Sequence, residues 1–251
     1  MKKLIVGNWK MNPSTGEEAR RLAQEVKKIA TKSRDKVVIC PPTIFLREIS
    51  GMIKKSKVAL GAQDVFWEEK GSFTGSISPI MLKNNGVSFV IIGHSERRTL
   101  GESDEVVKKK LRGALKGGLI PILCVGEKER DTHGYYLATV KRQLEGAFFG
   151  ISGNVAAKVI IAYEPVWAVG NKSFSSANPS EALEMAIFIR KTLADFYGSK
   201  RGSSFAVLYG GSVTKETASD YLVHDAVDGL LVGRESLKAS SFSEIVNFRK
   251  K

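Results

Sequence analysis

Eight short apolar segments recur along the chain, and their side chains do not alternate with polar ones. They are residues 4–6, 37–39, 58–60, 89–92, 120–124, 159–162, 205–208 and 230–232. A short unbroken apolar run is typical of a strand that is buried on both faces, as in a parallel sheet covered by helices. The pattern therefore predicts eight buried strands.

Amphipathic segments with a helical period lie between these runs. The clearest spans Ala19 to Ala30, with apolar residues three and four positions apart, and Thr15 with Glu18 forms a capping box at its start. Weaker patterns predict helices over residues 43–53, 79–85, 104–116, 136–148, 215–222 and 242–248.

A second strong helix signal begins at Asn178. This residue is the expected N-cap, Pro179 stands in the first turn, and Glu181 can return a carboxylate to the cap. The expected buried face of this helix consists of Ala182, Met185, Ala186, Ile189, Leu193 and Phe196.

Strand followed by helix, repeated eight times without a linker, predicts one α/β domain over residues 1–251. We expect a single (β/α)8 barrel, with an open doubly wound sheet as the competing arrangement. The first strand continues into residues 7–10 (GNWK) rather than into the glycine-rich turn of a dinucleotide-binding sheet. The barrel is therefore favoured.

Composition places the chain among folded soluble proteins, because 43% of its residues are hydrophobic and 26% are charged. No apolar run approaches the roughly 18 residues of a membrane span. The apolar stretch near the N-terminus ends at Gly7, so we expect no targeting segment. Cys40 and Cys124 are expected to be buried free thiols, and the expected location is the cytoplasm.

The formal net charge of +13 allows an anionic partner. The basic residues occur as pairs and triplets on predicted helix faces, such as residues 20–21, 54–55, 108–110 and 200–201, without interleaved aromatic residues. This distribution is typical of solvated surfaces, so we expect no nucleic-acid partner.

Polar residues that could carry chemistry stand just after the predicted strands. They are Asn8, Lys10, Gln63, His94, Ser95, Glu96, Glu127, Glu164, Gly210, Gly211, Ser212 and Gly233. Taken alone, a glutamate after a strand is commonly a solvated loop residue and a glycine pair is commonly a turn. In a parallel barrel, however, all these positions meet at the carboxyl-terminal mouth, where barrel enzymes carry their sites.

Two of these side chains are candidates for proton transfer. Glu164 stands at a strand end beside Trp167, which suits a general base. His94 precedes what is expected to be the first turn of a helix capped by Ser95, where backbone amides favour a neutral imidazole. No cluster of His, Cys and carboxylates has metal-ligand spacing, so neither a metal nor a cofactor is expected.

Small residues at two later strand ends indicate an anion site. Residues 209–212 (YGGS) and 232–234 (VGR) expose backbone amides without bulky side chains, a common way of holding phosphate in a barrel. Residues 168–178 form a loop of small and polar residues after Glu164, which is expected to be a lid. These residues predict an enzyme that moves protons on a small phosphorylated molecule, without naming the substrate.

Five segments in order resemble the triosephosphate isomerase family over nearly the whole chain. They are residues 7–12 (GNWKMN), 92–98 (IGHSERR), 124–127 (CVGE), 162–168 (AYEPVWA) and 209–212 (YGGS). The resemblance implies a TIM barrel that interconverts dihydroxyacetone phosphate and D-glyceraldehyde 3-phosphate through an enediolate, as in glycolysis and gluconeogenesis.

The resemblance also implies the residue roles. Glu164 would be the base, neutral His94 would polarise the carbonyl, and Lys10 and Asn8 would stabilise negative charge. Glu96 would orient its neighbours rather than act as a second base. The phosphate would be held by amides near Gly170, Gly211, Ser212, Gly233 and Arg234.

Residues 64–75 (DVFWEEKGSFTG) resemble the family's interdigitating loop, which implies a homodimer. Phe66, Trp67 and Phe73 would otherwise expose apolar surface to water. Thr74 would reach the neighbouring site and steady Lys10 and Asn8.

Four departures from the family pattern bear on these expectations. The loop at residues 170–178 is longer than usual and lacks the second glycine of the lid. Arg234 replaces a glycine after the eighth strand, and its guanidinium is expected to face away from the phosphate. Ser76 stands where many members carry glutamate. Residues 99–102 (TLGE) form a shorter segment than usual, so the partners of Arg97 are expected to differ.

Two other functions stay open at this point. The chain could be a barrel that acts on another sugar phosphate as an isomerase or lyase. It could also be a dimeric barrel that binds phosphates or nucleic acid without turnover, an alternative motivated by the net charge and the altered lid.

Overall fold

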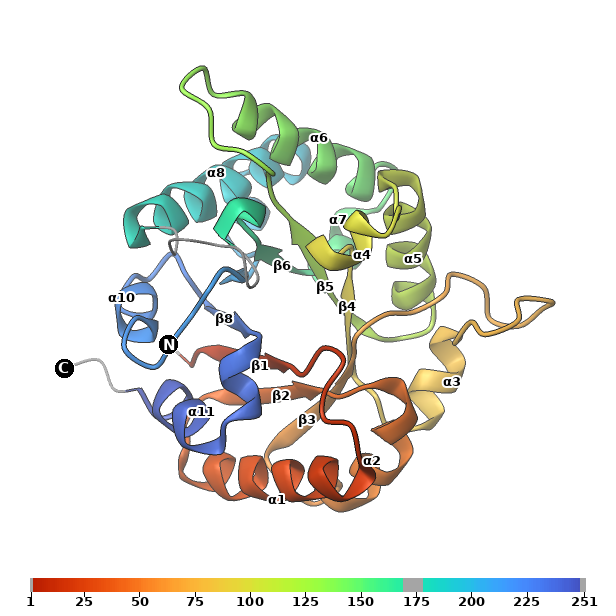
Figure 1. Cartoon of the computed structure of the whole chain (residues 1–251). Helices are drawn as coiled ribbons and strands as arrows, with labels where there is room; N and C mark the ends of the chain where they lie inside the picture. Colours follow the sequence, from red (N-terminus) through yellow and green to blue (C-terminus); the bar gives the residue numbers. More distant parts are fainter. Residues whose placement is uncertain (1, 169–177, 249–251) are drawn as a thin grey trace.

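The computed structural model describes residues 2–168 and 178–248. Eight strands form a closed barrel in which neighbours follow the order of the chain, and every pair is parallel. Figure 1 views this ring with its helices outside. The strands are β1 (Leu4–Asn8), β2 (Lys36–Cys40), β3 (Val58–Ala62), β4 (Phe89–Ile92), β5 (Ile120–Val125), β6 (Ile160–Tyr163), β7 (Val207–Tyr209) and β8 (Gly229–Val232). The predicted barrel is confirmed, and the open sheet is wrong.

The two strongest helix predictions are confirmed together with their caps. Thr15 and Glu18 form a capping box at the start of α1 (Gly16–Lys32), and Asn178 and Glu181 form one at the start of α8 (Pro179–Tyr197). The other long helices near their expected positions are α2 (Leu46–Ile53), α3 (Pro79–Asn84), α5 (Asp104–Lys116), α6 (Tyr135–Phe148) and α11 (Ala239–Val246).

Short helices account for most of the boundary errors. The predicted helix over residues 43–53 begins with the 3₁₀ turn η1 (Thr43–Phe45), and α10 (Ala218–Leu222) starts later than expected. The sequence pattern did not predict α7 (Gly153–Ala156), α9 (Ser199–Gly202), η2 (Val166–Ala168) or η3 (Arg234–Leu237), because a single turn has too few residues to show a period. The remaining helix, α4 (Ser95–Thr99), belongs to the site.

One core assignment is wrong. Phe196 was expected on the buried face of α8, but 37% of its surface is exposed. In this last turn the following residue, Tyr197, takes the inner place and packs against the rings of Phe148 and Phe205.

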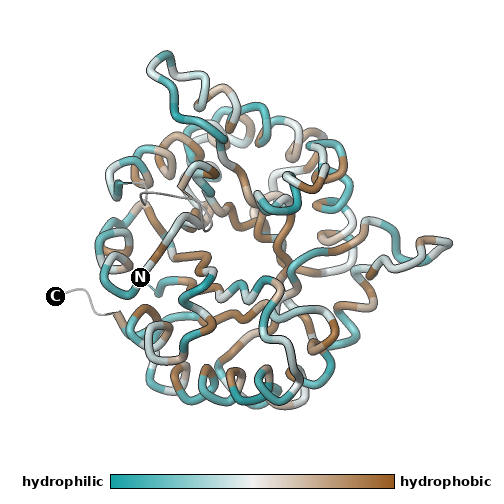
Figure 2. Tube along the Cα trace, viewed as in Figure 1, coloured by the Kyte–Doolittle hydropathy of each residue, from teal (hydrophilic) through white to brown (hydrophobic). Residues whose placement is uncertain are grey.

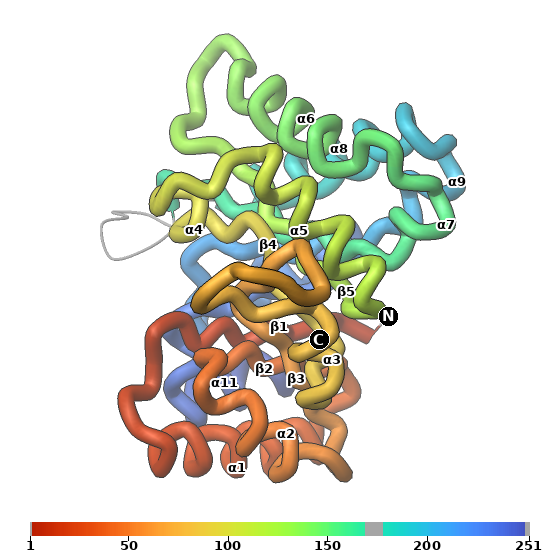
Figure 3. The backbone as a smooth tube through the Cα atoms, turned by 90° about the vertical axis from the view of Figure 1, so that its right-hand side faces the viewer, coloured from red at the N-terminus to blue at the C-terminus, as the bar shows by residue number. Residues whose placement is uncertain are grey.

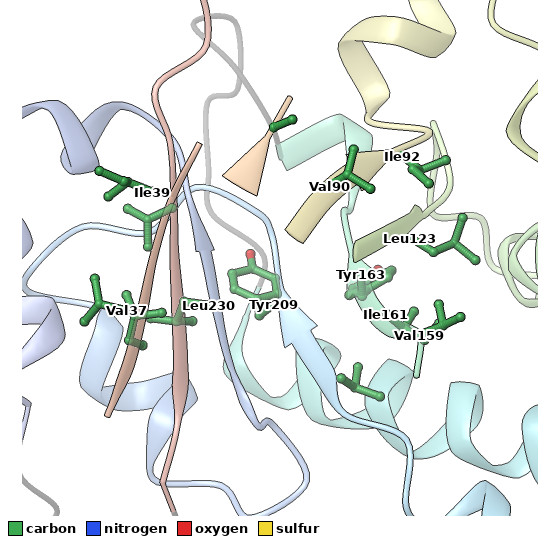
Figure 4. Packing of buried hydrophobic residues seen from close by; sticks show 14 of the residues in the cluster. Val37, Ile39, Val90, Ile92, Leu123, Val159, Ile161, Tyr163, Tyr209 and Leu230 are labelled. Carbon is green, nitrogen blue, oxygen red and sulfur yellow. The ribbon is translucent and has the colours of Figure 1, made fainter. Parts of the chain in front are cut away.

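The core has two layers. A small cluster fills the inside of the barrel, and it includes Val6, Val38, Phe89, Ile91 and Leu208. A larger cluster lies between the strands and the surrounding helices; Figure 4 shows part of it, and Figure 2 shows the apolar strands inside a polar outer surface. Because side chains fill the barrel, a ligand can only bind at one of its ends.

Both cysteines are buried free thiols, as predicted. Burial raises the pKa of the Cys40 thiol well above its ordinary value, so this group stays protonated and unreactive at neutral pH. Among the residues that the structure describes, no helix is both long and apolar enough to cross a membrane.

Candidate active site at the carboxyl end of the barrel

The predicted site residues gather at the carboxyl ends of the strands. A cavity of about 720 Å³ is lined by Asn8, Lys10, His94, Glu96, Gly211, Ser212, Gly233 and Arg234, among others. A neighbouring cavity of about 730 Å³ shares the first four of these residues and continues along the loop after β3. Residues from four different strand ends, β1, β4, β7 and β8, therefore form one site.

Glu164 follows β6 and is almost fully buried, with 1% of its surface exposed. Its Oε2 accepts a hydrogen bond of 2.9 Å from the Ser95 amide, and its Oε1 lies 3.2 Å from His94 Nε2. The end of β5 packs tightly against it, since a Cβ on Gly126 would lie 1.8 Å from the Glu164 carbonyl oxygen. The carboxylate is therefore held in one place beside the imidazole.

His94 is the N-cap of α4, which corrects the expectation that Ser95 caps this helix. The His94 Nδ1 accepts a hydrogen bond of 3.1 Å from the Glu96 amide. Ser95 already belongs to the helix, and its amide is directed to Glu164 instead. Because Nδ1 is an acceptor, the ring proton resides on Nε2, and the imidazole is neutral. Its one N–H is therefore on the nitrogen that lies 3.2 Å from Glu164 Oε1.

Lys10 extends its ammonium over the same cavity. Its Nζ lies 2.6 Å from Glu96 Oε1, and its amide donates a hydrogen bond of 3.0 Å to Asn8 Oδ1. Lys10 has a φ of 54°, a conformation that is costly for a side chain with a Cβ, and Gln63 Nε2 donates to its carbonyl oxygen at 2.8 Å. Glu96 is thus in direct contact with the Lys10 ammonium, and its positioning role stays a prediction.

Two glycines of the expected phosphate site, Gly211 and Gly233, leave room for neighbouring side chains. A Cβ on Gly211 would lie 2.1 Å from the Tyr209 hydroxyl oxygen, and one on Gly233 would lie 3.3 Å from Lys10 Cε. The Ser212 hydroxyl donates to the Ala168 carbonyl at 2.7 Å, and its amide donates to the same oxygen at 3.3 Å. A phosphate would have to compete with this oxygen for the Ser212 amide.

Arg234 starts η3 and is exposed. Arg234 lines the cavity that also contains Gly211 and Gly233. The expectation that its guanidinium faces away from the phosphate stays a prediction. Gly170 and the longer loop at residues 170–177 lie outside the described residues.

Glu127, Tyr163 and Trp167 form a buried cluster beside the site. The sequence places Glu127 among the polar residues after the strands but does not indicate its role. Its Oε1 accepts hydrogen bonds from the Tyr163 hydroxyl at 2.8 Å and from Trp167 Nε1 at 2.9 Å. Burial raises the pKa of Glu127 above its ordinary value. The cluster fixes η2, the turn directly after Glu164 and Pro165.

The sequence does not indicate a role for the Cys124 thiol either. Burial raises its pKa well above the ordinary value, and the neighbouring Glu164 carboxylate raises it further. The thiol therefore stays neutral and does not add a second negative charge next to Glu164.

The short segment before α5 has a defined set of partners. Arg97 Nη2 lies 2.9 Å from Asp64 Oδ2, and its Nε lies 3.2 Å from Glu102 Oε2. The buried Lys110 ammonium contacts the same two carboxylates at 2.5 and 2.7 Å. This ion cluster ties the start of the loop after β3 to α4 and α5.

Across residues 2–168 and 178–248, no group of three or more His, Cys, Asp or Glu side chains has the arrangement of a metal site. The donors and acceptors that do meet are a carboxylate, a neutral imidazole and an ammonium. These groups can take a proton from a ligand and stabilise the negative charge that this step creates.

Fold and site together define a (β/α)8-barrel enzyme with its polar residues at the mouth of the barrel. The family model described as triosephosphate isomerase matches residues 3–249. The chain belongs to the triosephosphate isomerase family.

Individual relatives agree with this assignment. The chain is 43% identical over 247 residues to a triosephosphate isomerase of Thermoanaerobacter pseudethanolicus, with 98% of each chain covered. It is also 43% identical to one of Roseiflexus sp. (strain RS-1), which covers 98% of this chain and 96% of the relative. The crystal structure of triosephosphate isomerase from Bartonella henselae superposes with a TM-score of 0.85 at 38% identity, and 98% of each chain is covered.

Proposed function

We propose that this protein interconverts dihydroxyacetone phosphate and D-glyceraldehyde 3-phosphate as one catalytic domain over residues 1–251. The observation that carries the proposal is the His94 ring, whose Nδ1 accepts from the Glu96 amide while its Nε2 lies 3.2 Å from the Glu164 carboxylate. A carboxylate and an imidazole thus lie side by side at the carboxyl ends of β6 and β4, which supports these roles. The reaction belongs to glycolysis and gluconeogenesis.

The proposed reaction is a proton transfer between neighbouring carbon atoms. Glu164 takes the proton from the hydroxyl-bearing carbon next to the carbonyl. The electrons of the broken C–H bond form the C=C bond of the enediolate, and the π pair of the carbonyl moves onto the carbonyl oxygen. His94 Nε2–H, the Lys10 ammonium and Asn8 donate hydrogen bonds to the enediolate oxygens. His94 moves a proton between the two enediolate oxygens, and Glu164 returns its own proton to the carbon that carried the carbonyl. A carbonyl forms at the other carbon, so no external oxidant, reductant or cofactor is consumed.

Charge placement supports these roles. The Lys10 ammonium is held by Glu96 at 2.6 Å, so it is oriented before the substrate arrives. The Ser95 amide donates a hydrogen bond to Glu164 Oε2, and the other carboxylate oxygen, Oε1, lies beside His94 Nε2. The amides at Gly211, Ser212, Gly233 and Arg234 are our proposed phosphate ligands, and Gly170 is proposed with them on sequence grounds alone.

A comparison of substrates tests the proposal. We expect turnover with glyceraldehyde 3-phosphate and none with five- or six-carbon sugar phosphates in the same buffer. Preferred turnover of a larger sugar phosphate would instead support another sugar-phosphate isomerase. Binding of triose phosphate without turnover would support a non-catalytic barrel.

Arg234 is expected to raise the affinity for the dianionic substrate. Arg234 is exposed and lines the cavity that also contains Gly211 and Gly233. Arg234→Gly should therefore raise KM by about tenfold, which corresponds to roughly 1.4 kcal/mol, and leave kcat nearly unchanged. Steady-state kinetics at several salt concentrations measures this effect, and kcat/KM of the unmodified protein should fall as salt rises. Equal KM values for both proteins would show that the guanidinium faces away from the phosphate.

We further propose a homodimer in the cytoplasm. Figure 1 shows the loop between β3 and α3 projecting from the barrel, and this loop contains Phe73 and Thr74. The ring of Phe66 stacks on Trp67 at 3.9 Å and contacts Phe73 at 4.5 Å, while Phe73 is 44% exposed. Met11 and Leu100 are highly exposed and line the groove that begins at Lys10. A projecting aromatic loop and a groove with exposed apolar side chains at its edge suit a twofold interface.

Sedimentation velocity tests this interface. Phe73→Asp should weaken dimerisation by about a hundredfold, because it places a charge in an apolar contact. The matched control is Tyr135→Asp, which changes an aromatic side chain on α6 that is 70% exposed and should leave the dimer intact. A monomeric unmodified protein would contradict the proposal. Ser76 lies in the same loop, and its variant Ser76→Glu can be compared in the same measurement.

A further inference from the structure

A second concave region lies at the opposite end of the barrel from the proposed active site. It is a cavity of about 1100 Å³, formed where the strands begin, and its lining includes the residues just before β1, the last residue of α1, the first residue of β2 and the end of α11. In Figure 3, α4 lies on the left and the N-terminus, just before β1, lies on the right. The two cavities are therefore separated by the packed interior of the barrel.

The lining of this basal cavity is strongly basic. Six cationic side chains line it, against the two carboxylates of Asp35 and Asp225. The cations are Lys2, Lys3, Lys32, Arg34, Lys36 and Lys57. A concave surface with an excess of one charge concentrates the opposite charge, because field lines converge there.

Two of the six cations have structural duties. The Lys3 ammonium donates to the carbonyl oxygens of His224 and Val227 at 3.1 and 2.6 Å, and Lys57 donates to the Thr31 carbonyl oxygen at 3.2 Å. These bonds satisfy carbonyl groups in the turns and at a helix end, which is a common use of lysine. Lys3 and Lys57 therefore do not by themselves indicate a ligand.

The other cations lack carboxylate partners. Among the residues that the structure describes, no ion pair joins Lys2, Lys32, Arg34 or Lys36 to an acidic side chain. The Lys36 ammonium sits 4.7 Å from the centre of the buried Phe89 ring, at the floor of the barrel. Asp35 lies between Arg34 and Lys36 in the sequence, and its Oδ1 accepts a hydrogen bond of 2.8 Å from the Lys3 amide. The positive charge of the cavity is thus largely uncompensated by the protein.

We propose that this basal cavity binds a compact oligophosphate, either inorganic or as the triphosphate of a nucleotide. Several closely spaced phosphoryl groups match several cations around one concavity, and the fork of Arg34 can hold two phosphate oxygens at once. A cavity of about 1100 Å³ has room for a ligand of this size. The isolated phosphate of a triose would engage only part of this charge.

The proposal is independent of the proposed isomerase activity. None of the residues lining the basal cavity lines either cavity at the mouth. Binding at the base is therefore measured directly, by calorimetric titration of the full chain with tripolyphosphate, without reference to turnover.

The decisive variant removes two cations that have no structural hydrogen bond among the described residues. Lys32→Gln with Arg34→Gln should weaken tripolyphosphate binding by about tenfold or more, because two charge-assisted contacts are lost. The matched control is Arg142→Gln with Lys191→Gln, which removes the same two residue types from exposed positions on α6 and α8. This control lowers the net charge equally and should bind like the unmodified protein.

Further titrations show which of the two cavities binds the ligand, and whether the ligand is an inorganic oligophosphate or a nucleoside triphosphate. Lys10→Ala should retain the basal binding, since Lys10 belongs to the mouth. A nucleoside triphosphate that binds more tightly than tripolyphosphate would show that the cavity also contacts the nucleoside; equal affinities would identify the phosphates alone as the ligand. Equal weakening in both double variants, or no saturable binding at about 0.15 M salt, would overturn the proposal, because the basic residues would then act only through general charge.

Discussion

Glu164→Asp will lower kcat by about a hundredfold or more while leaving the protein folded. The substitution keeps the charge but withdraws the carboxylate by one methylene, and a misplacement of about 1 Å is enough to cost this much in a proton transfer. The position of Glu164 is unusually well defined, because the Ser95 amide holds Oε2 at 2.9 Å and His94 Nε2 lies 3.2 Å from Oε1. Steady-state kinetics and thermal unfolding of the same sample provide the measurement.

A surface glutamate is the control for this experiment. Glu145→Asp shortens an exposed side chain on α6 and should change neither kcat nor the melting temperature. If Glu164→Asp turned over as fast as the unmodified protein, Glu164 could not be the base. A variant that had lost its melting transition would be replaced by Glu164→Gln, which keeps the length of the side chain.

Lys10→Ala will lower kcat/KM by about a thousandfold. Removing a preorganised donor that stabilises developing negative charge costs about 10² to 10³ in rate, and Lys10 also supplies charge for binding the dianion. The ammonium is fixed by Glu96 at 2.6 Å and fills the space left by Gly233, so a surface lysine cannot replace it. Kinetic assays at saturating and low substrate concentrations separate the effects on kcat and KM.

Two further variants help to interpret the effect of Lys10→Ala on kcat/KM. Glu96→Gln keeps Lys10 but weakens its orientation, and it should cost less than Lys10→Ala if Glu96 is a positioning residue. Lys28→Ala changes an exposed lysine of α1 and should be neutral. A Lys10→Ala protein with normal kcat/KM would remove the ammonium from the mechanism.

The barrel could be predicted from the sequence because its strands are buried on both faces. Runs such as residues 89–92 and 120–124 contain only apolar side chains, and they became β4 and β5. The long helices could be predicted because Thr15 and Asn178 form capping boxes. The single turns could not, since α7 and α9 are set by packing and loop closure rather than by a repeated pattern.

The location of the site could also be predicted, because parallel strands bring their carboxyl ends together. Its finer geometry could not. The His94 side chain rather than Ser95 caps α4, since the backbone turns so that the Ser95 amide meets Glu164. The requirement for Gly126 follows from its closeness to the Glu164 backbone, a contact between residues that are far apart in the sequence.

The cluster around Glu127 shows the same limit. Tyr163 and Trp167 are close to Glu164 in sequence, but nothing in their spacing indicates that both donate to one buried carboxylate. The partners of Arg97 likewise depend on where the loop after β3 lies, because Asp64 is brought to Arg97 by the fold. Contacts of this kind require the three-dimensional structure.

A coupled assay of glyceraldehyde 3-phosphate isomerisation, with the unmodified protein and Lys10→Ala side by side, tests the central claim most directly. The proposed mechanism predicts rapid turnover by the unmodified protein and about a thousandfold lower kcat/KM for the variant. Absence of turnover in a folded, dimeric, unmodified protein would contradict it and favour a barrel that binds phosphates without catalysing their isomerisation.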